Sequence, residues 1–322
     1  MVFSSPIFLF GFLPITLLLY YLSPRAGRNL VLLACSLLFY SWGETFYILV
    51  MLASILANFL SGLLIDKALR ENAATTARAY LAAGIGINLL LLISFKYANF
   101  IADNLSTLFS LVHLPGPDLH PVHLPLGISF FTFQAISYIV DVYRKETSVQ
   151  RNVFDLALYI SLFPQLIAGP IVRYHDVALQ IRDRMHSIEL FSSGAQRFIY
   201  GLAKKVLIAN PLGEVADSVF LLDGSDLTLP LAWLGIVAYS LQIYFDFSGY
   251  SDMAIGLGRM FGFRFLENFN YPYISKSLRE FWKRWHISLS SWFRDYVYIP
   301  LGLPITHKNN WTSIVAYFML RA

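Results

Sequence analysis

The 322-residue sequence has little cysteine and little charge, and both shortages narrow its class. Its single cysteine, Cys35, excludes a disulfide within the chain and disfavours a thiolate metal site. Charged residues make up 14% of the sequence, against about 25% in soluble domains, and hydrophobic residues make up 57%. The net charge of +4 is too small to indicate nucleic-acid binding. The composition predicts an all-α, polytopic protein of the lipid bilayer.

Metal motifs, repeats and linkers are also missing. The seven histidines show no HExxH spacing, and we interpret His113, His120 and His123, in a proline-rich loop, as solvated residues. No repeat of 20–50 residues and no long linker divides the chain, which predicts a single membrane domain over residues 1–322. We expect no metal and no bound cofactor.

Apolar runs predict where the chain crosses the membrane, because a span needs about 17–25 apolar residues. The predicted spans are 2–22, 46–65, 80–95, 126–142, 153–171 and 229–245, with a shorter run at 29–42. Pro164 and Pro170 predict a kink or interruption in the fifth span, and the three cations of 194–210 fit an interfacial helix. Lys and Arg gather in alternate loops, after 22, 65 and 142, which places those loops in the cytoplasm and the N-terminus outside.

Residues 271–302 form a basic, aromatic segment with one histidine at its centre. Ser277 and Glu280 have capping-box spacing, which predicts a helix starting near Leu278. At 100° per residue this helix carries one polar stripe, made of Arg279, Lys283, His286, Ser290 and Arg294. Such a stripe suits an anionic, phosphate-bearing ligand held beside a general base. The alternative is an interfacial helix with aromatic belts and cations extended toward lipid headgroups.

A second polar group interrupts the apolar background at 241–262. Its polar residues at or near membrane depth include Asp246, Ser248, Tyr250 and Asp252. They either line a water-filled cavity, with the local glycines breaking the helix, or belong to close helix packing. Asp246 or Asp252 can orient an imidazole, and Gln134 can line a tunnel or bond to a neighbouring helix.

Six segments carry a family resemblance. They read MVFSSPIFLFGFLPI from Met1, FKYANF from Phe95, LPLGISFFTFQAISYIVDVYR from Leu124, FPQLIAGPIVRY from Phe163, YFDFSGYSDMAIGLGRMFGFRFLENFNYPYISKSL from Tyr244 and FWKRWHISLSSWFRDYVYIPLG from Phe281. In this order they resemble the membrane-bound O-acyltransferase family, in particular its bacterial alginate O-acetyltransferase branch. The resemblance implies a ring of tilted transmembrane helices with re-entrant or interfacial helices, multi-pass in the bacterial inner membrane with a periplasmic N-terminus. It also implies acetyl transfer from a cytoplasmic thioester, acetyl-CoA, to a periplasmic acetyltransferase partner and an exported polysaccharide such as alginate.

Residue by residue, the resemblance makes His286 of the WHIS motif catalytic. The phosphates of the donor need cations, which the nearby residues Arg279, Lys283, Arg284 and Arg294 can supply. The family's second histidine, in a Leu-Trp-His-Gly motif, is expected about forty residues later, but the sequence ends at Ala322 without it, and His307 stands in a polar turn. We therefore expect the C-terminal spans to be missing. Three hypotheses follow: a truncated acetyltransferase, a catalytically incomplete scaffold of an envelope polysaccharide complex, or a transferase for another acceptor, in teichoic acid D-alanylation or in peptidoglycan or cellulose acetylation.

Overall fold

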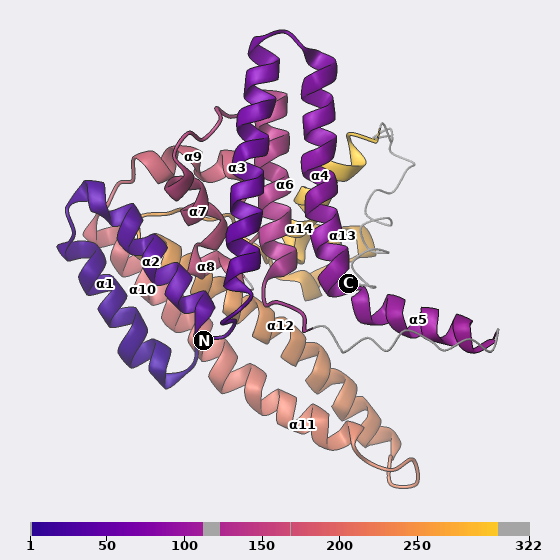
Figure 1. The fold of residues 1–322 in the computed structure, drawn as a ribbon. Coiled ribbons are helices and arrows are strands. Elements are labelled where there is room, and N and C mark those ends of the chain that lie inside the picture. Colours follow the sequence, from indigo (N-terminus) through magenta and orange to yellow (C-terminus); the bar gives the residue numbers. More distant parts are fainter. Residues whose placement is uncertain (1, 112–122, 168, 302–322) are drawn as a thin grey trace. The chain divides into compact units, whose positions relative to one another are not determined.

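A computed structural model describes residues 2–111, 123–167 and 169–301, and all regular elements among them are helices (Figure 1). His307 and the rest of 302–322 lie outside the described residues. The chain divides into two compact units. Among the described residues, the first unit comprises 2–28, 169–172 and 176–301, and the second unit comprises 29–111, 123–167 and 173–175. The predicted all-helical character is confirmed for the described part of the chain.

The second unit contains two long apolar helices that lie side by side as a hairpin, α3 (Ile48–Arg70) and α4 (Ala74–Lys96) (Figure 1). By length and composition both can cross a membrane, and they coincide with the predicted spans 46–65 and 80–95. The buried amides of Asn58 and Asn88 exchange hydrogen bonds of 3.1 and 2.7 Å between the two helices. Such pairs satisfy polar groups that lipid cannot, and each bond is worth about 0.6–2 kcal/mol in a membrane.

Shorter helices complete this unit. They are α2 (Arg28–Ser41, which begins in the first unit), α5 (Ala98–Leu111), α6 (Ile128–Arg144), α7 (Val153–Ser161) and α8 (Phe163–Leu166). Leu162 separates α7 from α8 with a non-helical backbone (φ −54°, ψ 108°), directly before the two residues Phe163 and Pro164 that open α8. Proline lacks an N–H and clashes with the preceding turn, so the predicted interruption of 153–171 is confirmed.

The first unit begins with an apolar helical segment, Phe8–Leu22, made of a π-helical turn η1 (Phe8–Phe12) and α1 (Leu13–Leu22). A short turn η2 (Arg25–Gly27) follows. Helix α9 (Tyr174–Arg182) belongs to this unit from residue 176 on. It is followed by α10 (Ile188–Ala203), a π-helical turn η3 (Lys204–Ala209), α11 (Asn210–Phe220) and α12 (Leu229–Met260). The last described elements are η4 (Pro272–Ile274), α13 (Leu278–Arg284), α14 (Ile287–Phe293) and η5 (Arg294–Tyr298).

Helix α12 is continuous over 32 residues, so the break considered for 241–262 is absent. At about 1.5 Å per residue it is ~48 Å long, well above a ~30 Å bilayer core. Its glycines serve packing instead. A Cβ on Gly201 of α10 would lie 2.5 Å from the carbonyl oxygen of Gly249 of α12, and one on Gly256 would lie 2.6 Å from that of Gly194. Backbone therefore lies directly against backbone, as in other small-residue helix contacts in membranes.

Candidate functional site

His286 lies at a break between two seven-residue helices, α13 and α14. Helix α13 starts as predicted, because the Ser277 hydroxyl accepts the backbone N–H of Glu280 at 3.2 Å. It ends at Arg284, and His286 then takes a left-handed backbone conformation (φ 45°, ψ 54°) before α14 begins. The single helical stripe through Arg294 is therefore wrong. Left-handed backbone is uncommon for a residue other than glycine and occurs in turns and at functional sites; Asn72, Lys145 and Tyr271 also adopt it here.

Asn268 explains the break. Its backbone carbonyl accepts the Ile287 N–H at 3.0 Å, and its side-chain oxygen Oδ1 accepts the Ser288 N–H at 3.1 Å. The same Oδ1 accepts the Ser288 hydroxyl at 2.8 Å and lies 3.1 Å from Nδ1 of His286. Asn268 is fully buried, so these bonds form away from water. A residue 18 positions upstream thus starts α14 and holds the imidazole.

The same contacts fix the tautomer of His286. A backbone N–H can only donate, so the Ser288 N–H identifies the contacting atom of Asn268 as its carbonyl oxygen. Because that oxygen only accepts, Nδ1 of His286 must carry the proton, and the lone pair is on Nε2. No described residue gives Nε2 a hydrogen-bond partner. The imidazole therefore has the protonation pattern of a general base.

The surroundings of His286 keep it neutral. The side chain is 8% exposed, and the Phe247 ring stands perpendicular to the imidazole with centroids 4.8 Å apart. Burial lowers the pKa of His286 to about 3, because a charged ring loses its hydration there. The neighbouring Trp285 stacks against Phe281 at 5.5 Å and meets Phe269 edge-on at 5.1 Å. Aromatic residues of this basic segment and of the preceding chain thus pack around the break.

The four predicted donor-binding cations lie in the same segment but differ in their partners. Arg284 bonds to Glu280 at 2.9 Å, and Arg294 to Asp295 at 2.6 Å. Lys283 is exposed, and within the described ranges no carboxylate lies in ion-pair range of it. Arg279 is exposed as well. Lys283 is therefore better available to a ligand phosphate than the paired Arg284 and Arg294, and the role of all four stays a prediction.

The polar residues of α12 form ion pairs with the neighbouring helical segment instead of reaching His286. Asp252 accepts from Arg197 at 2.7 Å and Lys204 at 2.6 Å, and Asp246 pairs with Lys205 at 2.5 Å. Tyr250 stacks on Phe3 with ring centroids 4.8 Å apart, and the Ser248 hydroxyl is buried with no partner among the described residues. The residue that orients the imidazole is Asn268, which sequence reasoning missed. Its only signal was a polar residue in the segment LENFNYPYIS.

Two features of the second unit bear on ligands. The Gln134 amide is 1% exposed, and neither its oxygen nor its nitrogen has a partner in the described part of the chain. Such a group suits the wall of a polar cavity, and the tunnel-lining role stays a prediction. Asp141, Glu146 and His175 place ligand atoms within 4.8 Å of one another. The Asp141 carboxylate already accepts Nδ1–H of His175 at 2.9 Å, which accounts for this contact without an ion.

Comparison with known proteins decides the family. A model of the membrane-bound O-acyltransferase family matches residues 140–322, more than half of the chain. The chain belongs to the membrane-bound O-acyltransferase family. A Pseudomonas putida protein described as probable alginate O-acetylase AlgI is 50% identical over 94% of this chain and 61% of its own length. A Helicobacter pylori peptidoglycan O-acetyltransferase is 35% identical over 94% of this chain and 62% of its length.

A Bacillus subtilis teichoic acid D-alanyltransferase is 31% identical over 67% of this chain and 57% of its own length. The chain thus spans about three fifths of the curated relatives that it matches. As a membrane-bound O-acyltransferase family member it is a membrane protein, and the two long apolar helices of its second unit agree with that. The matched region includes Asn268, His286 and Ser288.

Proposed function

We propose that this chain carries the general base of a bacterial membrane O-acetyltransferase. The enzyme would transfer acetyl groups from cytoplasmic acetyl-CoA across the inner membrane for O-acetylation of an exported polysaccharide such as alginate. One observation supports this most: the buried, neutral imidazole of His286, whose Nδ1–H is held by Asn268 and whose Nε2 keeps its lone pair. The 50% identity to an alginate O-acetylase supports the acetyl group and the polysaccharide.

The chemistry follows from that imidazole. Nε2 of His286 takes the proton of an acceptor hydroxyl while the hydroxyl oxygen forms a bond to the thioester carbonyl carbon. The tetrahedral intermediate then expels the thiolate by breaking the C–S bond, and the imidazolium returns its proton to sulfur. Asn268 supports both steps, because its Oδ1 accepts Nδ1–H before and after the ring is charged. Negative charge on the bound intermediate raises the low pKa of His286 when the proton must be taken up.

The donor phosphates would bind the cations of the same segment, with Lys283 the best available and Arg279 exposed beside it. A periplasmic acetyltransferase partner would pass the acetyl group to the polysaccharide. A ring of tilted helices and a multi-pass inner-membrane location with a periplasmic N-terminus belong to this proposal. The Lys and Arg residues of alternate loops support this orientation, and the unpartnered amide of Gln134 supports a polar path through the protein.

The test is polysaccharide acetylation by cells that make the whole protein. His286→Ala should reduce acetylation by about 10²–10⁴-fold, the usual contribution of a general base, with the protein still in the membrane. His123→Ala is the matched control, because that side chain is 64% exposed and lies in the second unit, where it contacts Glu44 and the Tyr47 ring. Unchanged acetylation in His286→Ala would remove this histidine from the mechanism. Acetylated peptidoglycan or D-alanylated teichoic acid as the His286-dependent product would identify a different acceptor.

A further inference from the structure

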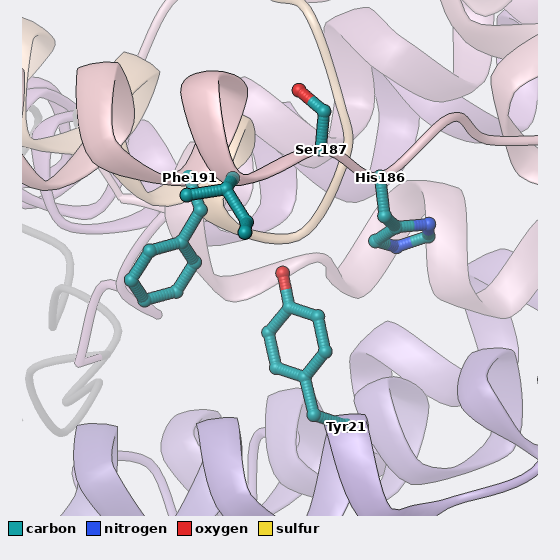
Figure 2. A pocket seen from close by; sticks show the side chains of 5 residues that line it. Tyr21, His186, Ser187 and Phe191 are labelled. Carbon is teal, nitrogen blue, oxygen red and sulfur yellow. The ribbon is translucent and has the colours of Figure 1, made fainter.

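A pocket lies in the first unit, between the end of α1 and the start of α10 (Figure 2). Its lining residues are Tyr21, His186, Ser187, Ile188 and Phe191, and its volume is about 310 Å³. Ligand pockets begin at about 300 Å³, so the space is sufficient for a small polar group. Figure 2 shows the Tyr21 hydroxyl ending between the Phe191 ring and the His186 imidazole, while the Ser187 hydroxyl points away.

Arginines surround the imidazole of this pocket. Nη1 of Arg28 lies 3.4 Å from Nδ1 of His186, and its guanidinium lies 5.7 Å from the Tyr21 ring centre. On the other side of the imidazole, Arg184 donates to the Tyr20 hydroxyl at 3.1 Å. The Nε atom of Arg28 is buried without a partner, and in the described part of the chain no carboxylate lies within ion-pair range of Arg28. Within the described residues, a cation without a carboxylate partner therefore lies beside the pocket, against the lining residue His186.

The hydrogen bonds require His186 to be neutral. Arg28 can only donate, so Nδ1 of His186 accepts and Nε2 carries the proton. Nε2–H then donates to the Tyr20 hydroxyl at 2.9 Å, which donates to the Phe261 carbonyl at 2.9 Å. Burial lowers the pKa of His186, and the positive fields of Arg28, Arg184 and Arg25 lower it further. Burial first, and then the neighbouring guanidinium groups, thus act against a proton on the ring.

Of the two arginines beside His186, Arg184 has a structural role among the described residues and Arg28 does not. Arg184 also donates to the Gln180 carbonyl at 3.2 Å and so caps the end of α9. The first turn of α10 is satisfied by Ser187, which accepts the Leu190 N–H at 3.1 Å. Arg28 has no comparable structural bond among those of the described residues; its contacts are the imidazole and two tyrosine rings. A half-buried cation of this kind calls for an anionic partner.

We propose that this pocket binds the phosphate group of an anionic ligand, held by the guanidinium of Arg28 at its edge. Guanidinium matches phosphate geometry through paired N–H donors, and tyrosine rings stack on its plane. The rim favours a phospholipid headgroup over a soluble phosphate, because Leu22, Met185 and Ile188 are 74%, 86% and 84% exposed and can contact acyl chains. Arg25 and Arg28 also follow the first predicted span in a loop assigned to the cytoplasm, where lipid headgroups are often anionic. This site is separate from acetyl transfer and does not depend on it.

The test compares lipid binding by the whole protein in detergent, measured by native mass spectrometry with phosphatidylglycerol and with phosphatidylcholine. Arg28→Gln should weaken phosphatidylglycerol binding about tenfold, the usual effect of losing one charge-assisted hydrogen bond. Arg78→Gln is the matched control, because it removes an exposed arginine from the second unit. A parallel titration with inorganic phosphate separates the sources: Arg28-dependent binding of phosphate itself indicates a soluble ligand, and dependence seen only with phosphatidylglycerol indicates a lipid.

Two variants at Ile188 with opposite charges test the same proposal in a protein that keeps Arg28, so the test does not depend on the folding of Arg28→Gln. Both Ile188→Glu and Ile188→Lys remove the same exposed side chain from the pocket lining, so only the sign of the new charge differs. Ile188→Glu should weaken phosphatidylglycerol binding, and Ile188→Lys should retain it. Equal binding by these two variants, or equal losses in Arg28→Gln and Arg78→Gln, would overturn the proposal.

Discussion

Replacing Asn268 by alanine tests the geometry around the candidate base. The change removes the oxygen that accepts from Nδ1 of His286 and from the backbone and hydroxyl of Ser288. The Ser288 hydroxyl can turn elsewhere, but two N–H groups stay buried without an acceptor. Each costs about 1–3 kcal/mol, so Asn268→Ala should lower the stability of the folded protein by ~2–6 kcal/mol.

Asn268→Ala should also slow acetyl transfer, by a smaller amount that can be measured separately from the loss of stability. One hydrogen bond to the ring, worth about 1 kcal/mol net, keeps the lone pair on Nε2, so its loss should slow acetyl transfer about fivefold per folded molecule. His286→Ala, which removes the base itself, should cost about 10²–10⁴-fold. Asn268→Asp retains an acceptor of the same size and adds a negative charge 3.1 Å from the ring, which raises the pKa of His286.

The assay is the pH dependence of acetyl transfer, normalised to the amount of folded protein from gel filtration. In Asn268→Asp the base should become protonated as the pH falls through its raised pKa, so the rate should decline at a higher pH than in the wild type. A residue with only a structural role would leave that profile where it was. Full activity in folded Asn268→Ala, together with an unshifted profile in Asn268→Asp, would refute the role of Asn268 in positioning His286.

Three further predictions concern packing, pH and the donor. Gly201→Ala should lower the free energy of unfolding by about 1–3 kcal/mol, because its new Cβ would press on the Gly249 carbonyl oxygen. Gly86→Ala should leave that free energy unchanged, because no atom of a neighbouring described segment lies within 4 Å of its new Cβ. Because the pKa of His286 is lowered to about 3, between pH 6.5 and 3 the unfolded chain takes up a proton that the folded chain does not. The free energy of unfolding should therefore decrease as the pH falls from 6.5 to 3. Chemical unfolding at several pH values should show a smaller decrease in His286→Gln. Lys283→Glu should raise the KM for acetyl-CoA with little change in kcat, and a change in expression level alone would favour the interfacial interpretation.

Local signals predicted much of the fold. The capped start of α13 at Ser277 and the interruption before Pro164 both depend on neighbours within a few residues, and both are present. The break at His286 could not be read from the sequence, since no glycine or proline marks it. It depends on the carbonyl and amide of Asn268, which only the fold brings to that point. Periodicity assumes an unbroken helix, so it placed His286 and Arg294 on one stripe.

The candidate site was predicted in part for the same reason. Composition and motif pointed to His286, but the choice of Asp246 or Asp252 as its orienting partner followed from charge alone. The structure pairs those carboxylates with Lys205, Arg197 and Lys204, cations that lie 41 to 55 positions away in sequence. The glycines of α12 gave a wrong prediction for a similar reason. They suggested a break in the helix, whereas α12 is continuous and its glycines pack against the backbone of α10.

The most direct test of the central claim is acetyl transfer in inside-out membrane vesicles that contain the whole protein and are supplied with labelled acetyl-CoA. Wild-type vesicles that enclose the periplasmic partner and a polysaccharide acceptor should transfer label to that acceptor, and His286→Gln vesicles with the same contents and amount of folded protein should be slower by at least about a hundredfold. Equal rates in the two preparations would contradict the assignment of His286 as the general base.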